Sequence, residues 1–122
     1  MFAASKAGNY FLASQFARRY GDIGIISNSW NHGNLTTELQ RHVNWLAQLL
    51  SKLMLHPARF GGYTELWAGW AEASGGKEHN GDYVWPWGRF GSLREDLVKE
   101  TGEGGKAEKF WEWCERETAR YA

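Results

Sequence analysis

Residues 23–29 read IGIISNS, and this short apolar run decides the fold class. Three of its seven residues are isoleucine, a β-branched residue that favours strands, and glycine and asparagine bound the run. Short, nearly continuous apolar runs are typical of strands that are covered on both faces, as in a parallel sheet. We therefore expect a buried strand at 23–29 and an irregular loop over residues 30–36.

Helices are predicted on both sides of this strand. Apolar residues recur every three or four positions over residues 5–20, and Gly21 with Asp22 then ends the helix. A second helix is expected from Thr37, because Gln40 completes a capping-box pattern and leucines continue at helical spacing to residue 55. The remaining predictions are a helix over 58–73, a loop over 75–81, a strand over 83–87, a helix over 92–100, a glycine-rich hinge at 102–105 and a helix over 107–121.

Only about two short strands occur in this α/β alternation. Pro86 indicates that the second strand lies at a sheet edge, because proline cannot donate to a hydrogen-bond ladder. Two strands seldom form a stable parallel sheet by themselves. The pattern therefore predicts part of a larger fold.

The composition excludes several classes of partner. Lys and Arg total 14 and Asp and Glu total 14, so no net charge favours nucleic acid or an anionic membrane. The longest apolar run, residues 45–55, is interrupted by polar residues and is too short to span a bilayer, and with no leader pattern we expect a cytoplasmic protein. One cysteine, Cys114, rules out an internal disulfide and is expected to be buried in the last helix.

Aromatic residues are abundant. They make up 16% of the chain, which has eight Trp, so we expect a small core to leave some of them exposed. Paired Trp positions favour core or subunit contacts over a substrate pocket, although both interpretations stay open; the pairs are Trp67 with Trp70, Trp85 with Trp87, and Trp111 with Trp113. The histidines show no paired spacing with each other or with the cysteine, so no metal site is expected.

Three separated motifs carry a family resemblance: SKAGN at 5–9, IGIISNS at 23–29 and NHGNLTTEL at 31–39. In this order and spacing they resemble short-chain dehydrogenase/reductases, of the fungal type related to retinol-dehydrogenase-like reductases. The resemblance continues through NGDYVWPWGRFGS (80–92) and KFWEWCE (109–115). It implies the C-terminal part of a Rossmann-like doubly wound α/β fold, with residues 1–122 as a single partial domain.

The resemblance also implies site residues. Family members carry a Tyr four residues before a Lys; the Tyr exchanges the proton, and the Lys holds the nicotinamide ribose and lowers the pKa of the Tyr. Lys6 matches the Lys, but Phe2 stands at the Tyr position. The family's cofactor loop maps onto Gly33, Leu35 and Thr37, with His32 in place of a Pro. The helix from residue 38 to 55 corresponds to the lid over the substrate.

The family's glycine-rich turn, which seats the cofactor pyrophosphate at a helix N-terminus, belongs to a βαβ unit that this sequence does not contain. We therefore expect no cofactor on the isolated chain, although the family uses NAD or NADP. Lys6 and His32 are the candidate catalytic residues. The plainer interpretations, an inherited helix residue for Lys6 and a tolerated loop residue for His32, are favoured.

Three functions remain open. The first is a truncated reductase-like protein without NAD(P)-dependent activity of its own. The second is a repurposed isomerase or cyclase that binds an apolar small molecule in a biosynthetic pathway of secondary metabolism, with His32 as its acid. The third is a non-enzymatic partner that forms a homo-oligomer or binds a full-length reductase, because a helix and a sheet edge would be left uncovered.

Overall fold

The structure is a computed structural model that describes residues 2–36 and 54–121. The expected lid helix and Thr37 therefore lie almost wholly outside the described residues. The elements are, in order, α1 (Phe2–Tyr20), η1 (Gly21–Ile23), β1 (Ser29–Trp30), β2 (Leu35–Thr36), β3 (His56–Pro57), α3 (Arg59–Trp70), η3 (Glu72–Ser74), η4 (Lys77–His79), β4 (Tyr83–Trp85), β5 (Arg89–Gly91), α4 (Glu95–Lys99), α5 (Lys106–Thr118) and η5 (Ala119–Tyr121).

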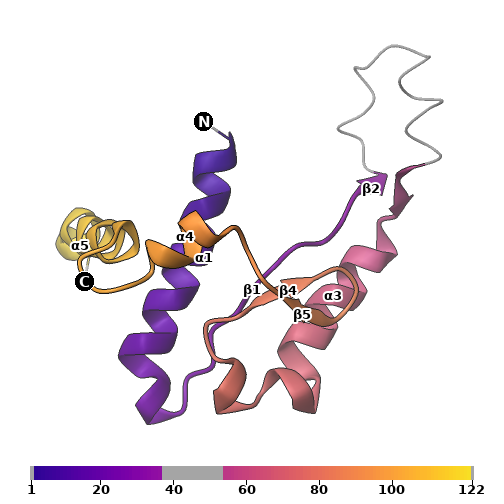
Figure 1. Cartoon of the computed structure of the whole chain (residues 1–122), viewed down its shortest axis with the longest axis horizontal. Coiled ribbons are helices and arrows are strands. Elements are labelled where there is room, and N and C mark those ends of the chain that lie inside the picture. Colours follow the sequence, from indigo (N-terminus) through magenta and orange to yellow (C-terminus); the bar gives the residue numbers. More distant parts are fainter. Residues whose placement is uncertain (1, 37–53, 122) are drawn as a thin grey trace.

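The main sheet lies between two helices, α1 on one side and α3 on the other (Figure 1). Its strand order is β1-β4-β5, with β1 parallel to β4 and β4 antiparallel to β5. A second small sheet pairs β2 with β3 in parallel, Leu35 opposite His56. The predicted α/β class, rich in helix and with short parallel strands, is thus confirmed.

The strand expected over residues 23–29 is much shorter than predicted. Only Ser29 and Trp30 are in β1, and residues 21–23 form the 3₁₀ turn η1. Hydrogen bonds from Ile25 N to Tyr20 O (3.2 Å) and from Gly24 N to Gly21 O (3.0 Å) bind this segment to the end of α1 instead of to a strand. As a result Ile23 is 76% exposed, so the prediction of a buried strand start was wrong.

The prediction from Pro86 was also wrong. β4 is the central strand of its sheet, because it pairs with β1 on one side and β5 on the other. The strand ends at Trp85, and Pro86 lies in the turn that follows, where it removes no hydrogen bond from the ladder. Gly88, with φ of 84°, continues this turn, and its N–H donates to Trp85 O at 3.2 Å. The chain then returns as β5, a strand that was not predicted.

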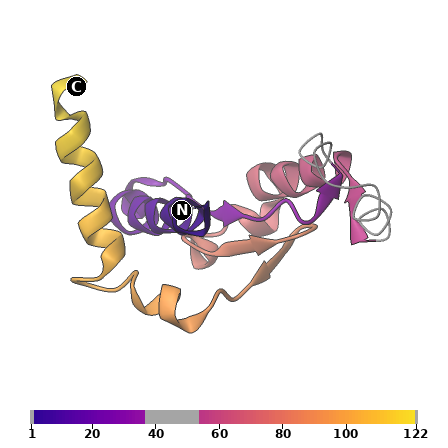
Figure 2. The same cartoon turned by 90° about the horizontal axis from the view of Figure 1, so that it is seen from above.

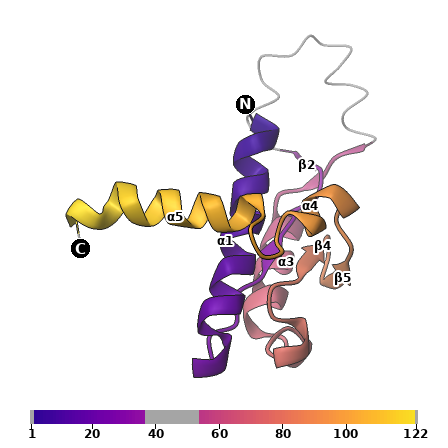
Figure 3. The ribbon, with the colours of Figure 1, turned by 60° about the vertical axis from the view of Figure 1, so that its left-hand side comes forward.

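The C-terminal helix α5 crosses α1 and extends away from the sheet (Figures 2 and 3). Ala107 and Trp111 of α5 are buried, and the Phe110 ring lies 3.2 Å from the position that a Cβ on Gly8 of α1 would take. Cys114 is half-buried, which corrects the expectation of full burial. The helices predicted around α1, α3, α4 and α5 are confirmed, with α3 and α4 shorter than expected.

Candidate functional site

A cavity of about 480 Å³ lies between α1 and β1 and brings together both candidate catalytic residues, Lys6 and His32. The volume is within the range of small-molecule sites, roughly 300–1,000 Å³. Its lining is Lys6, Asn9, Tyr10, Leu12, Ala13, Phe16, Ser27, Asn28, Ser29, Trp30, His32 and Tyr83. Positions 6, 9, 10, 13 and 16 of α1 reach it together because helical spacing places them on adjoining faces of the helix.

His32 is paired with a carboxylate. Its Nε2 lies 2.6 Å from Glu65 Oε1 of α3, and both side chains are about half exposed, at 48% and 53%. A carboxylate at this distance can orient an imidazole, and oriented imidazoles are used in general acid–base chemistry. Glu65 could not be predicted as the partner of His32 from sequence spacing, because the two residues are 33 positions apart.

The other predicted cofactor residues lie apart from this cavity. Gly33 has φ of 84°, its N–H donates to Asn31 Oδ1 at 2.9 Å, and Pro86 packs beside it. Leu35 lies in β2, close to Gly61 of α3. Thr37 is outside the described residues. The structure therefore places Lys6 with His32 and leaves Gly33 and Leu35 in a separate region.

One glycine-rich turn among the described residues resembles a phosphate-binding turn in its position only. The glycine-rich turn at 102–105 precedes α5, as a phosphate-binding turn would. Two backbone amides here are already hydrogen-bonded to carboxylates, however. Gly104 N of the turn donates to Glu108 Oε2 at 2.7 Å, and Lys106 N at the start of α5 donates to Glu100 Oε2 at 3.0 Å. Carboxylates in these places repel a pyrophosphate. Lys6 alone among the predicted residues lines the cavity as a candidate ribose contact.

Two tyrosines that the sequence did not mark as site residues line the cavity. Tyr10 and Tyr83 meet at right angles, with ring centroids 6.4 Å apart. Burial raises the pKa of both hydroxyls, and the negative charge of Asp82 raises the pKa of Tyr10 further. Both hydroxyls therefore keep their protons near neutral pH, so neither supplies the readily ionised phenol that the family chemistry requires.

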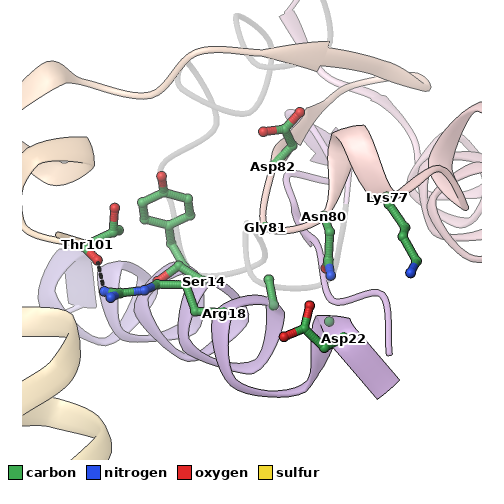
Figure 4. A pocket seen from close by; sticks show the side chains of 11 residues that line it. Ser14, Arg18, Asp22, Lys77, Asn80, Gly81, Asp82 and Thr101 are labelled. Atoms are coloured by element: carbon green, nitrogen blue, oxygen red, sulfur yellow. Dashed lines mark hydrogen bonds between the residues drawn. The ribbon is translucent and has the colours of Figure 1, made fainter. Parts of the chain in front are cut away.

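A second cavity, of about 400 Å³, lies at the C-terminal end of α1 (Figure 4). Several of its polar groups are bonded within the protein: Arg18 donates to Thr101 O at 3.2 Å, and Asp82 lies 2.9 Å from His79. Asn80 accepts from Ser27 N at 2.8 Å and donates to Ile25 O at 2.9 Å. This cluster holds the segment before β1 against the loop before β4, and its role is structural.

Neither a metal-binding cluster nor a membrane-spanning helix is found in the part of the chain that the structure describes. Within residues 2–36 and 54–121, no group of three or more His, Cys, Asp or Glu side chains could hold a metal ion. No helix in this same part of the chain is long and apolar enough to cross a bilayer.

Comparison with known proteins assigns the family. A short-chain dehydrogenase/reductase of Pestalotiopsis fici, iacJ, is 43% identical over 94% of this chain. Short-chain dehydrogenase/reductases of Armillaria gallica and Phomopsis amygdali are 40% and 39% identical over 99% and 98% of it. The chain belongs to the short-chain dehydrogenase/reductase family. It spans little more than a third of these relatives, 36%, 37% and 39% of their lengths, as expected for part of the family fold.

Two other comparisons gave no match. No family model matches the sequence, and no solved structure gives a significant match. The family assignment therefore rests on the fungal reductases.

Proposed function

We propose that this 122-residue chain, as an isolated polypeptide, is the C-terminal part of a short-chain dehydrogenase/reductase without NAD(P)-dependent oxidoreductase activity. One observation carries the proposal: Phe2 stands four residues before Lys6, where the family places its catalytic Tyr. A phenyl ring has no hydroxyl, so it cannot exchange a proton during hydride transfer.

The site supports the proposal in two further ways. Tyr10 and Tyr83 are the phenols that line the cavity and that could stand in for the catalytic Tyr of the family. Burial, however, raises their pKa values instead of lowering them. The turn before α5 has its amides bonded to Glu100 and Glu108, so it offers no place for a pyrophosphate. The isolated chain therefore lacks both an acid of the family type and a phosphate cradle among the described residues.

A fluorescence titration of the isolated chain with NADPH tests the proposal. We expect no saturable change, and Phe2→Tyr alone should not create one, because the hydroxyl supplies no cofactor affinity. Saturable binding in the micromolar range would overturn the proposal. A relative such as iacJ of Pestalotiopsis fici is the positive control for the assay.

The pair of His32 with Glu65 favours a second candidate function. An imidazole 2.6 Å from a carboxylate, beside an aromatic cavity, suits acid–base rearrangement of an apolar small molecule without a cofactor. This would be a metabolite-modifying isomerase or cyclase of secondary metabolism in the cytoplasm. His32→Ala and Glu65→Gln should each abolish turnover of a candidate substrate, whereas His79→Ala is the control. Unchanged turnover in His32→Ala removes His32 from the mechanism.

The open edge of β1 favours a third candidate, a non-enzymatic partner. In the described part of the chain, β1 has β4 as its only sheet neighbour, so its other edge can accept a strand from a second copy or from a full-length reductase. Size-exclusion chromatography with light scattering tests self-association. A folded monomer that does not bind a reductase relative would exclude this function.

A further inference from the structure

We propose that the cavity between α1 and β1 binds an uncharged planar aromatic molecule with one hydrogen-bond acceptor, and that the Ser29 hydroxyl donates to that acceptor. This deepens the second candidate function, because it names the ligand class of the same cavity. It does not depend on whether the ligand is turned over.

The first observation is the unsatisfied hydroxyl of Ser29. Its residue is 8% exposed, and Oγ has no hydrogen-bond partner. A buried polar group without a partner costs about 1–3 kcal/mol, so it points to a group that the structure does not contain. In the described part of the chain, two other buried side-chain atoms lack partners, on Gln15 and Trp111, and neither residue lines this cavity.

The second observation is the side of the sheet that Ser29 faces. Asn28 and Trp30 also line a separate cavity of about 690 Å³ beside α3, whereas Ser29 lines only the cavity beside α1. Alternate residues of a strand face opposite sides of a sheet, which places Ser29 on the α1 side. Tyr83, its register partner on β4, lines the same cavity.

Some polar side chains of α1 and of the segment before β1 are already hydrogen-bonded within the protein, unlike the Ser29 hydroxyl. Ser14 Oγ donates to Phe11 O at 2.8 Å, and Asn28 bonds both Ser74 O and Gly81 N. The hydrogen bonds of these groups leave no reason to expect a ligand near them. We therefore expect the acceptor atom of a ligand to lie beside the Ser29 hydroxyl, where it would accept a hydrogen bond.

The aromatic and aliphatic side chains that line the cavity favour an apolar, planar shape for the rest of the ligand. Phe16 and Trp30 are large aromatic residues that remain 40% and 42% exposed, and Leu12, Tyr10 and Tyr83 complete an apolar surface. Such walls favour a flat aromatic molecule, which gains buried area and ring contacts. The Ser29 hydroxyl has a proton to donate, so it favours an acceptor on the ligand.

Quinoline and naphthalene are suitable probes, because they share a shape and only quinoline has an acceptor nitrogen. Equilibrium dialysis of the full chain at pH 7.5, followed by absorbance, gives the two dissociation constants. We expect quinoline to bind roughly fivefold to tenfold more tightly, the effect of one hydrogen bond to a buried hydroxyl. Ser29→Ala should remove this preference while naphthalene binding is retained, and Ser92→Ala, at an exposed position outside the cavity, should keep it.

Ser29→Cys adds a second variant of similar size with only a weak donor, and it should also lose the preference. Equal binding of the two probes by the unmodified chain, an unchanged ratio in Ser29→Ala and Ser29→Cys, or no binding of either probe would each overturn the proposal. The NADPH titration and the His32→Ala turnover assay have separate readouts. His79→Ala, outside this cavity, should leave the quinoline preference unchanged, so failure of the ligand site is distinguishable from failure of the proposed function.

Discussion

Trp111 of α5 meets Phe16 of α1 edge to face, with ring centroids 4.8 Å apart and ring planes at 83°. The guanidinium of Arg19 lies over the same indole, 5.2 Å from its centroid. Edge-to-face rings and cations over aromatic faces add to the stabilisation from burial alone. This contact joins the projecting helix α5 to the rest of the structure.

Trp111→Ala should therefore destabilise the chain strongly. Trp111 is 6% exposed, and loss of a buried Trp side chain costs about 3–5 kcal/mol. Trp113 is on the same helix but is 49% exposed, so Trp113→Ala is the matched control and should cost about 1 kcal/mol or less. Urea unfolding followed by circular dichroism measures both, and equal losses would contradict the packing described here.

Substitutions of three glycines should separate backbone strain from crowding. Gly81 has φ of 93°, and a Cβ there would lie 3.2 Å from the Ala17 Cβ. Gly24 has φ of 92° with no atom within 4 Å, so Gly24→Ala isolates the cost of the left-handed backbone, about 1–2 kcal/mol. Gly81→Ala should cost more than Gly24→Ala, because it adds the contact to the strain.

Gly62 is the control for this series. It lies within α3, and a Cβ there would meet nothing within 4 Å. Gly62→Ala should stabilise the chain by up to about 1 kcal/mol, the difference in helix propensity. Thermal unfolding of the three variants gives the order, and destabilisation by Gly62→Ala would contradict the placement of α3.

Stability should depend on pH through the ion pair at the start of α5. Lys106 Nζ lies 2.7 Å from Glu100 Oε1, and hydrogen bonds from Lys106 hold the pKa of Glu100 below its usual value. Because the folded pKa is lowered, this stabilisation is present above the unfolded pKa and is lost as pH falls through the folded pKa. Glu100 in turn raises the pKa of Lys106, so the Lys106 contribution is present below the unfolded pKa and is lost as pH rises through the folded value.

Glu100→Gln tests this linkage. The variant should lose less stability than the unmodified chain between pH 7 and pH 3, because its side chain does not titrate. Urea midpoints at several pH values measure the difference, and Glu103→Gln is the control on the same turn. Parallel pH profiles for Glu100→Gln and the unmodified chain would contradict the prediction.

The hydroxyls of Tyr10 and Tyr83, which line the cavity, should ionise at a higher pH than an exposed tyrosine does. Burial, with the charge of Asp82 for Tyr10, raises the pKa values of Tyr10 and Tyr83 above the ordinary value of 10.0. In absorbance titrations of phenolate, Tyr10→Phe and Tyr83→Phe should each remove a group that ionises above pH 10. Since the unfolded chain ionises these groups first, their contribution to stability is lost as pH rises above 10. A titration complete near pH 10 would contradict the burial of both rings.

Local patterns in the sequence predicted the helices well, because their apolar spacing is a property of neighbouring residues. α1 and α5 are the best cases: the first ends at Tyr20 as predicted, and the second begins one residue before its expected start. The strand at 23–29 was predicted less well, because strand length depends on a neighbouring strand. Here the Asn80 side chain occupies Ser27 N and Ile25 O, and β4 pairs with two residues of β1.

The sequence by itself indicated the family, through motifs at 5–9, 23–29 and 31–39, and it showed that Phe2 stands four residues before Lys6. Only the tertiary structure decided that His32 pairs with Glu65 and that the Ser29 hydroxyl is buried without a partner. The physical reason is distance along the chain. Spacing records which residues share a helix face or strand, whereas contacts between α1, β1 and α3 form only when distant segments pack together.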